Sequence, residues 1–180
     1  VVAAIYRRLL ESRDLLLVNM PGPFTSLRTR RLAAELAARL GCPYAEIPIG
    51  DSAEMTRRQL NEVKFATVDG RIEEKLAISE SVFENVQARD RGARVLAAVA
   101  AASGAVFTCN SNKSETTVGY ATLYGDICGY FANIADLWKG EVYALGRYLN
   151  EMVYPEPVIP AGIFEVTPSA ELSPAQNVDE

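Results

Sequence analysis

Hydrophobic residues along the chain alternate between helical stripes and short continuous apolar runs. Apolar side chains recur at helical spacing over residues 1–10, which predicts an opening helix. The run LLLVNM, residues 15–20, is short and apolar throughout, as is typical of a strand buried on both faces. Helical spacing returns over residues 27–40, where Ser26 is a suitable N-cap and Gly41 follows the predicted end.

The same alternation continues through the middle of the chain. Residues 44–49 are predicted to form a second strand and residues 52–64 a helix. An alanine-rich helical region is expected from about 72 to 102, broken or kinked near Gly92, and residues 105–109 form a third predicted strand. This order predicts an α/β fold, a three-layer Rossmann-like parallel sheet with helices on both faces.

The two ends of the chain depart from a simple alternation. Residues 135–152 predict a helix capped by Asp136, with Lys139 three residues into it. Residues 154–180 contain five prolines and are expected to be extended or in short turns, as a lid or clamp. A doubly wound domain normally starts on a strand, so we expect a strand and a loop to precede Val1, and the fold to be incomplete at the N-terminus.

Composition narrows the classes of function. The net charge of −5 gives no basic footprint for nucleic acid, and no apolar run approaches the length needed to cross a membrane. Three cysteines without a CxxC pair argue against a disulfide framework and indicate a reducing, cytoplasmic compartment. The chain has no histidine, which excludes Ser-His-Asp, Cys-His and His-metal chemistry. Chemistry based on positioning and charge neutralisation, as in nucleotidyl or phosphoryl transfer, remains.

The densest polar stretch is CNSNKSETTVGYATLYGD, residues 109–126, directly after the third predicted strand. Ligands of parallel α/β sheets bind beyond the carboxyl ends of strands. Within this stretch, Asn112 and Glu115 have the spacing of a capping box. Glu115 is also a suitable oxygen ligand for Mg²⁺, and the two interpretations are compatible.

A second polar group lies in ENVQARDRG. Asn85 and Arg89 are four residues apart and share a helix face, and Gly92 leaves room for close approach there. A second row consists of Gln87, Arg91 and Arg94. The group is either a solvated charged face or, as an amide beside a guanidinium, a site for a carboxylate or phosphate.

Three further features add little by themselves. Lysine near a helix N-terminus is slightly unfavourable, which suggests an anion near Lys139, although an exposed lysine is the commoner explanation. Trp138 and Tyr143 are predicted to be core residues. By themselves, Ser169 and Glu171 in TPSAEL predict a turn.

Neither GxxxxGK[ST] nor GxGxxG occurs in the sequence, so the two commonest phosphate-binding loops are absent from it.

The motifs NVQARDRG, NKSETTVGYATLYGD, DLWKGEV and PSAEL follow one another in this order, and together they resemble NAD⁺ synthetases. The resemblance covers nearly the whole chain and is to the synthetase domain of the glutamine-dependent enzymes. It implies that residues 1–180 are one C-terminal synthetase domain fragment, with residues 154–180 as a tail or lid over the nucleotide site. The implied fold is adenine nucleotide alpha hydrolase-like.

The resemblance also implies a ligase reaction. ATP activates the nicotinate carboxylate of deamido-NAD⁺ as an adenylate with release of pyrophosphate, and ammonia then displaces AMP. The implied cofactors are ATP and Mg²⁺. The implied partners are an upstream glutaminase domain that supplies ammonia from glutamine, and a second copy in a homodimer or higher oligomer, with neither nucleic acid nor membrane.

Site residues follow from the matching positions. The resemblance implies no catalytic side chain. It implies ATP contacts at Asn110, Lys139 and Ser169, and a metal role for Glu115. The implied deamido-NAD⁺ contacts are Asn85, Arg89, Glu115, Tyr120 and Asp126.

Departures from the family pattern leave alternatives open. Asn110 stands where the family usually has threonine, whereas Leu123 stands where ammonia-dependent members carry lysine, which favours the glutamine-dependent branch. The SGGxDS phosphate loop is missing, so we expect the chain alone to be inactive. The alternatives are a non-catalytic nucleotide-binding or dimerisation module of the same fold, or another ATP-pyrophosphatase, such as a tRNA-thiolating or GMP-forming enzyme.

Overall fold

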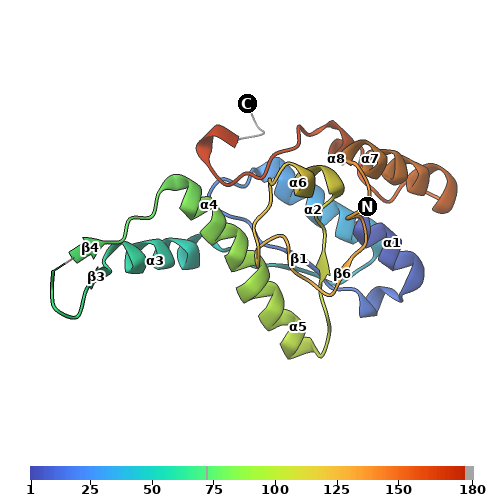
Figure 1. The fold of residues 1–180 in the computed structure, drawn as a ribbon. Coiled ribbons are helices and arrows are strands. Elements are labelled where there is room, and N and C mark those ends of the chain that lie inside the picture. The colour runs from blue at the N-terminus through green and yellow to red at the C-terminus, as the bar shows by residue number, and fades with distance from the viewer. Residues whose placement is uncertain (72, 177–180) are drawn as a thin grey trace.

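The computed structural model describes residues 1–71 and 73–176 and has an α/β architecture (Figure 1). The helices are α1 Val2–Leu9, α2 Leu27–Leu40, α3 Gly50–Asn61, α4 Glu80–Arg89, α5 Ala97–Ser103, α6 Lys113–Thr117, α7 Lys139–Tyr148 and α8 Gly162–Glu165. The strands are β1 Leu17–Asn19, β2 Tyr44–Glu46, β3 Lys64–Ala66, β4 Glu73–Lys75, β5 Thr108–Cys109 and β6 Phe131–Ala132. Short 3₁₀ turns cover Ser12–Asp14 and Pro174–Gln176, and π-helical turns cover Asp90–Leu96 and Leu149–Val153.

The strands of the described residues form three two-stranded sheets. β1 pairs with β2 and β5 with β6, both in parallel, whereas β3 and β4 form an antiparallel hairpin. The α/β class is therefore confirmed. The continuous sheet expected between two helical layers is not present among residues 1–71 and 73–176, because no hydrogen-bonded strand there joins β1 to β5.

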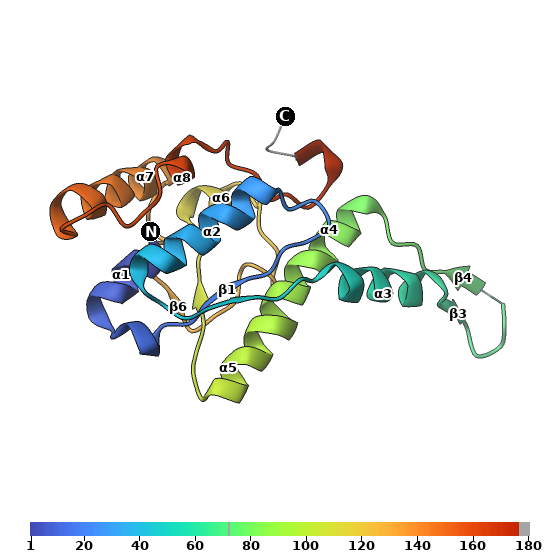
Figure 2. The same ribbon diagram turned by 180° about the vertical axis from the view of Figure 1, so that it is seen from behind.

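The hydrophobic core lies between the first two helices and the C-terminal part of the chain. Its buried members are Ala4, Leu40, Leu149, Val158 and Ile159. Both face-on views show α1, α2, α7 and α8 gathered at this end of the molecule (Figures 1 and 2). The core thus fixes α7 against the N-terminal helices, although the two regions lie far apart in sequence.

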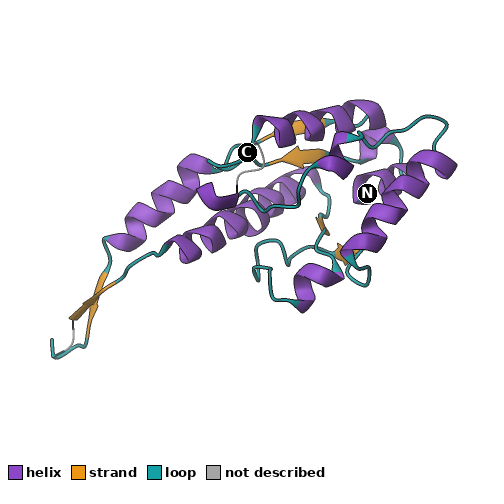
Figure 3. Ribbon diagram, turned by 90° about the horizontal axis from the view of Figure 1, so that it is seen from above, coloured by secondary structure: helices purple, strands orange, loops and turns teal. Residues whose placement is uncertain are grey.

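The middle of the chain departs from the predicted long helix. Residues 73–75 form β4, paired with Lys64–Ala66, and the helix begins only at Glu80, where Ser79 accepts a hydrogen bond from the N–H of Val82. The β3–β4 hairpin projects from the body on α3 and α4 (Figure 3). The prediction of a helix from 72 was wrong over 73–79, because strand pairing with 64–66 overrides the local pattern; Ile72 itself lies outside the described residues.

The predicted break near Gly92 is confirmed. α4 passes into a π-helical turn at Asp90 and continues as α5 from Ala97. A Cβ on Gly92 would lie 2.1 Å from the carbonyl oxygen of Gly125 and 2.5 Å from Cys128 Sγ. Glycine is therefore needed so that the loop after α6 can lie directly against the helix.

Candidate functional site

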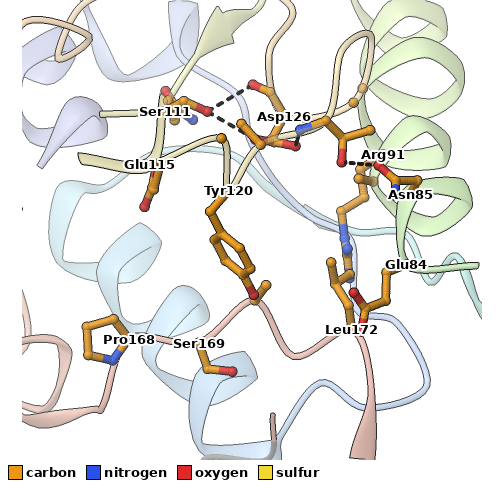
Figure 4. A pocket seen from close by; sticks show the side chains of 18 of the residues that line it. Glu84, Asn85, Arg91, Ser111, Glu115, Tyr120, Asp126, Pro168, Ser169 and Leu172 are labelled. Atoms are coloured by element: carbon orange, nitrogen blue, oxygen red, sulfur yellow. Dashed lines mark hydrogen bonds between the residues drawn. The ribbon is translucent and has the colours of Figure 1, made fainter. Parts of the chain in front are cut away.

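A cavity of about 1080 Å³ lies between α4, the loop of residues 110–128, the start of α7 and the tail (Figure 4). This volume is near the upper end of the usual range for small-molecule sites, about 300–1,000 Å³. Seven of the residues predicted from sequence line it: Asn85, Asn110, Glu115, Tyr120, Asp126, Lys139 and Ser169. Arg89 is exposed and is not part of the lining.

Glu115 is held by a complete capping box at the start of α6. The Asn112 side chain accepts the N–H of Glu115 at 3.2 Å, and Glu115 Oε2 accepts the N–H of Asn112 at 3.1 Å. The second carboxylate oxygen accepts a hydrogen bond from Lys139 Nζ at 3.0 Å. The predicted capping box is confirmed, and it aligns a carboxylate and an ammonium group side by side in the cavity wall.

Lys139 is the first residue of α7, with Trp138 as the N-cap. The predicted cap at Asp136 was wrong: the Glu141 carboxylate accepts the N–H of Trp138 at 2.7 Å, and the helix starts two residues later than expected. The N–H of Lys139 donates to Ser114 Oγ at 2.9 Å, which ties the helix start to α6. The anion that the sequence suggested near Lys139 is Glu115.

Trp138 is a surface residue rather than the predicted core residue. It is 46% exposed, and the ammonium group of Lys113 lies 4.6 Å from its ring centre. The reason is its position as the N-cap, which leaves the ring outside the packed face of α7. Tyr143, one helical turn later, is half-buried and packs on Phe164 with ring centres 6.2 Å apart.

Asn85 and Asp126 hold the loop that forms the far wall of the cavity. Asn85 Oδ1 accepts a hydrogen bond from Thr122 Oγ1 at 2.8 Å. Asp126 accepts the N–H of Thr122 at 2.8 Å and the hydroxyl of Ser111 at 3.3 Å (Figure 4). Arg89, on the same helix face as Asn85, donates from Nε to the carbonyl of Leu123 at 3.2 Å. The predicted face of α4 therefore positions this loop.

The Tyr120 phenol is influenced by several carboxylates of the cavity lining. Burial raises the pKa of the Tyr120 phenol, and the carboxylates of Glu84, Asp126 and Glu115 raise this pKa further. Figure 4 shows the ring extending between these groups towards the tail. The cavity lining therefore contains both carboxylates and the cationic groups of Lys139 and Arg91.

The second row runs from α4 into the π-helical turn, and its members differ in exposure: Arg94 is an exposed residue paired with Asp90, whereas Gln87 and Arg91 are not solvated surface residues. Gln87 is fully buried, and its Nε2 donates to the carbonyl of Leu172 at 2.8 Å. Arg91 lines the cavity and donates from Nε to the carbonyl of Met20 at 2.9 Å. Burial lowers the pKa of Arg91, an effect that Asp90 and Glu171 oppose.

Sequence reasoning missed several polar residues of the lining, among them Glu84 and Ser111. Glu84 comes from α4, next to Asn85, and Ser111 lies between the two asparagines that begin the polar stretch. The sequence signal that could have pointed to these two residues is their position next to predicted site residues. Asn110 was predicted, and its Oδ1 accepts from Thr108 Oγ1 at 2.9 Å at the exposed end of β5.

The carboxylates of the cavity fit one mode of Mg²⁺ binding. Among the described residues, no three His, Cys, Asp or Glu side chains form a cluster suited to a metal ion. Mg²⁺ in nucleotide sites is commonly held by one or two carboxylates together with substrate phosphates and water. Glu115 fits this mode, because its Oε1 accepts a hydrogen bond from the Lys139 ammonium group, and a lysine ammonium group on its flexible stem is also a phosphate ligand.

Two further observations concern the wider chain. Within residues 1–71 and 73–176, every helix is too short or too polar to cross a lipid bilayer. Cys42, Cys109 and Cys128 are free thiols.

Comparisons with known proteins identify the family. A family model described as NAD synthase matches residues 1–180. The chain is 38% identical over 179 residues to a glutamine-dependent NAD(+) synthetase of Thermotoga maritima, covering 99% of this chain and 29% of that protein. It is 40% identical over 160 residues to the Aquifex aeolicus enzyme of the same name, covering 88% and 26%. The chain therefore spans less than a third of the length of these relatives.

Solved structures give the same picture. A glutamine-dependent NAD⁺ synthetase from Acinetobacter baumannii, in complex with ADP, matches 94% of this chain and 30% of its own, with a TM-score of 0.79 and 30% identity. An NH3-dependent NAD synthetase from Campylobacter jejuni matches 84% of this chain and 58% of its own, with a TM-score of 0.69 and 28% identity. An NMN synthetase from Francisella tularensis shares the fold at 22% identity, with a TM-score of 0.78, over 98% of this chain and 63% of its own. On the family match over its whole length, this chain belongs to the NAD synthase family.

Proposed function

We propose that the chain is the synthetase part of an enzyme that amidates deamido-NAD⁺ to NAD⁺ at the expense of ATP. One observation carries the proposal: seven residues predicted for this reaction, from four separate segments, line a single cavity. The names of the glutamine-dependent relatives support glutamine as the source of nitrogen.

The reaction needs no side-chain nucleophile. A carboxylate oxygen of deamido-NAD⁺ attacks the α-phosphorus of ATP, pyrophosphate leaves, and ammonia then attacks the acyl carbon of the adenylate and displaces AMP. We propose that Lys139 neutralises phosphate charge and that Ser169 and Asn110 orient the nucleotide; all three line the cavity, which supports this proposal. Mg²⁺, when bound at Glu115, would screen the phosphates. The ADP complex of the Acinetobacter baumannii relative supports adenine-nucleotide binding.

The dinucleotide is proposed to lie along α4 and the loop after α6. Asn85, Tyr120 and Asp126 line that side of the cavity. Arg89 is the least direct of the predicted contacts, because its guanidinium is bonded to the loop backbone. We propose that it acts on the dinucleotide through this loop.

The finer features of the fold and assembly are part of the same proposal. We propose that β1–β2 and β5–β6 belong to one sheet of a three-layer, adenine nucleotide alpha hydrolase-like fold. We propose that residues 154–176 of the predicted tail cover the nucleotide. We also propose that the protein is a cytoplasmic homodimer with a glutaminase domain. The remainder of the predicted tail, residues 177–180, lies outside the described residues. Parallel pairing supports the shared sheet, the tail residues in the cavity lining support the cover, and the free cysteines support the compartment. The names of the glutamine-dependent relatives support the glutaminase domain, and the homodimer rests on the family resemblance.

The test uses the intact protein with ATP, Mg²⁺ and deamido-NAD⁺, with glutamine or ammonium as nitrogen donor. NAD⁺ is measured with a dehydrogenase, and AMP and pyrophosphate by chromatography. We expect AMP and NAD⁺ to appear in equal amounts, and Lys139→Met to reduce kcat/KM strongly. Lys113→Met is the matched control, because Lys113 is an exposed lysine outside the cavity lining.

The alternatives give other results. A nucleotide-binding or dimerisation module would bind ATP without forming AMP, which would contradict the proposal. Another ATP-pyrophosphatase would form AMP with a different acceptor and leave deamido-NAD⁺ unchanged. The match of the whole chain to the NAD synthase family favours the proposed reaction over both.

A further inference from the structure

The segment of residues 167–176, here called the strap, forms one wall of the cavity. Figure 4 shows its labelled residues across the cavity from Glu115 and Asp126. The lining residues of the strap are Thr167, Pro168, Ser169, Ala170, Leu172 and Gln176. Glu171 lies among them in sequence, is not part of the lining, and is only 5% exposed.

The Glu171 carboxylate is docked on the first turn of α2. Its Oε1 accepts the N–H of Ser26 at 3.2 Å and the hydroxyl of Thr29 at 3.1 Å. Ser26 is the N-cap of this helix, and its Oγ accepts the N–H of Thr29 at 3.0 Å. A carboxylate is favoured at a helix N-terminus, because the free N–H groups and the helix dipole carry partial positive charge there. The contact joins residues 145 and 142 positions apart in the chain.

The backbone at Glu171 supports a specific role for the residue. Its φ angle is +48°, in the left-handed region that glycine adopts more readily than other residues. Residues with side chains persist in this region when surrounding contacts determine the conformation. At Glu171 the surrounding contacts include those of its own carboxylate with α2.

Hydrogen bonds on either side of Glu171 close the strap into one unit. Ser169 Oγ accepts the N–H of Glu171 at 3.2 Å and donates to the carbonyl of Gln176 at 2.5 Å. Gln176 Oε1 accepts the N–H of Leu172 at 3.0 Å, and buried Gln87 donates to the carbonyl of Leu172. The position of Ser169 therefore depends on where Glu171 is held.

We propose that Glu171 is a positioning residue that latches the strap to α2 and so sets Ser169 against the bound nucleotide. The role rests on the proposed function, since Ser169 is a proposed ATP contact. Glu171 is not part of the cavity lining, and its carboxylate bonds to α2. Its charge also acts on Arg91 in the cavity wall, whereas Thr29→Val weakens the latch and leaves that charge in place. Loss of its carboxylate frees the strap without removing any group from the cavity wall.

The experiment compares Glu171→Ala with Glu165→Ala in the intact protein. Glu165 is an exposed carboxylate on the same tail, paired with Arg28 at 3.5 Å, so both changes remove one negative charge. We expect amide hydrogen exchange of residues 167–176, measured without ligand, to become at least about tenfold faster in Glu171→Ala only. We also expect KM for ATP to rise about tenfold while kcat changes less than about twofold, because ground-state binding is weakened.

Two further variants keep the test decisive if Glu171→Ala folds poorly. Thr29→Val removes the hydroxyl donor and keeps the shape, and it should speed exchange in the strap in the same direction. Glu171→Gln keeps an acceptor oxygen and should restore part of the ATP affinity. Unchanged exchange in Glu171→Ala and Thr29→Val, or faster exchange with unchanged KM for ATP, would overturn the latch. If the wild-type protein forms no AMP, the proposed function fails, whereas the ligand-free exchange still decides whether Glu171 anchors the strap.

Discussion

Glu115 illustrates how one residue serves both the fold and the site. Its Oε2 closes the capping box at Asn112, and its Oε1 is paired with Lys139 in the cavity. The first contact is local in sequence, and the second crosses from α6 to α7. The two roles can be separated, because glutamine can close a capping box but carries no charge.

We expect Glu115→Gln to fold with nearly unchanged stability and to bind Mg²⁺-ATP more weakly. Glu115→Ala should lose the ligand affinity and also about 1 kcal/mol of stability, because it breaks the capping box. Urea unfolding measures the stability. Isothermal titration with ATP, with and without Mg²⁺, measures the ligand affinity. Equal ATP affinity for Glu115→Gln and the wild type would contradict a role of this charge in the site.

At the scale of elements, α4 and the loop after α6 depend on close backbone contact. The two glycines at this contact approach each other's chains: a Cβ on Gly92 would strike the carbonyl of Gly125, and a Cβ on Gly125 would lie 2.9 Å from Ala88. The contact holds the loop that carries Tyr120 and Asp126. Sequence reasoning anticipated room near Gly92, but the segment that occupies it comes from more than thirty positions away, as the tertiary structure alone shows.

Gly92→Ala should destabilise the protein by at least about 1–3 kcal/mol, because the nearest atom is a backbone oxygen that cannot move aside cheaply. Gly140→Ala in α7 is the matched control, since no heavy atom lies within 4 Å of its added Cβ. That change should be neutral or stabilising by up to about 1 kcal/mol, because alanine favours the helix. Urea unfolding of both variants checks the difference, and equal stabilities would refute the packing argument.

The π-helical turn after α4 is fixed by Asp90, which is 9% exposed. Burial would raise the pKa of Asp90, but hydrogen bonds from Arg94 and Ser52 outweigh it and hold the pKa below its usual range. The hydroxyl of Ser52 donates to Asp90 at 2.6 Å and so joins α3 to this turn.

This lowered pKa gives a stability that depends on pH. Asp90 binds protons less readily in the folded than in the unfolded chain, so its contribution is present above the unfolded pKa of about 3.9 and is lost as pH falls through the lower folded value. We expect Asp90→Asn to be less stable at pH 7 and to lose less stability below pH 4 than the wild type does. Denaturant unfolding between about pH 7 and pH 3 measures both, with exposed Asp136→Asn as the control for charge. Parallel curves for Asp90→Asn and the wild type would rule out this contribution.

At the scale of the whole molecule, the cavity lies where segments from distant parts of the chain meet. α4, residues 108–128, Lys139 and the strap each contribute to its lining. A ligand that touches all four stabilises their mutual arrangement, since it binds only the folded chain.

We expect Mg²⁺-ATP at about a hundredfold excess over its Kd to stabilise the intact protein by about 2.7 kcal/mol. Differential scanning fluorimetry detects this as a rise in Tm, and Lys139→Met should reduce the rise because it removes a cation from the cavity. Lys113→Met should keep it. If Mg²⁺-ATP does not change the Tm of the wild type, this result would argue against a nucleotide site.

The sequence by itself determined the local features of this protein. The caps of α2 and α6, the break near Gly92 and the family motifs all depend on residues a few positions apart, so they can be read from spacing and side-chain chemistry. Tertiary structure alone decided the rest. It paired residues 73–75 with 64–66, moved the start of α7 to Lys139, buried Gln87 beneath the strap and docked Glu171 on α2. The physical reason is that these features depend on strand pairing, hydrogen bonds and packing that override local propensity, and in the last two cases the contacts join segments more than eighty positions apart.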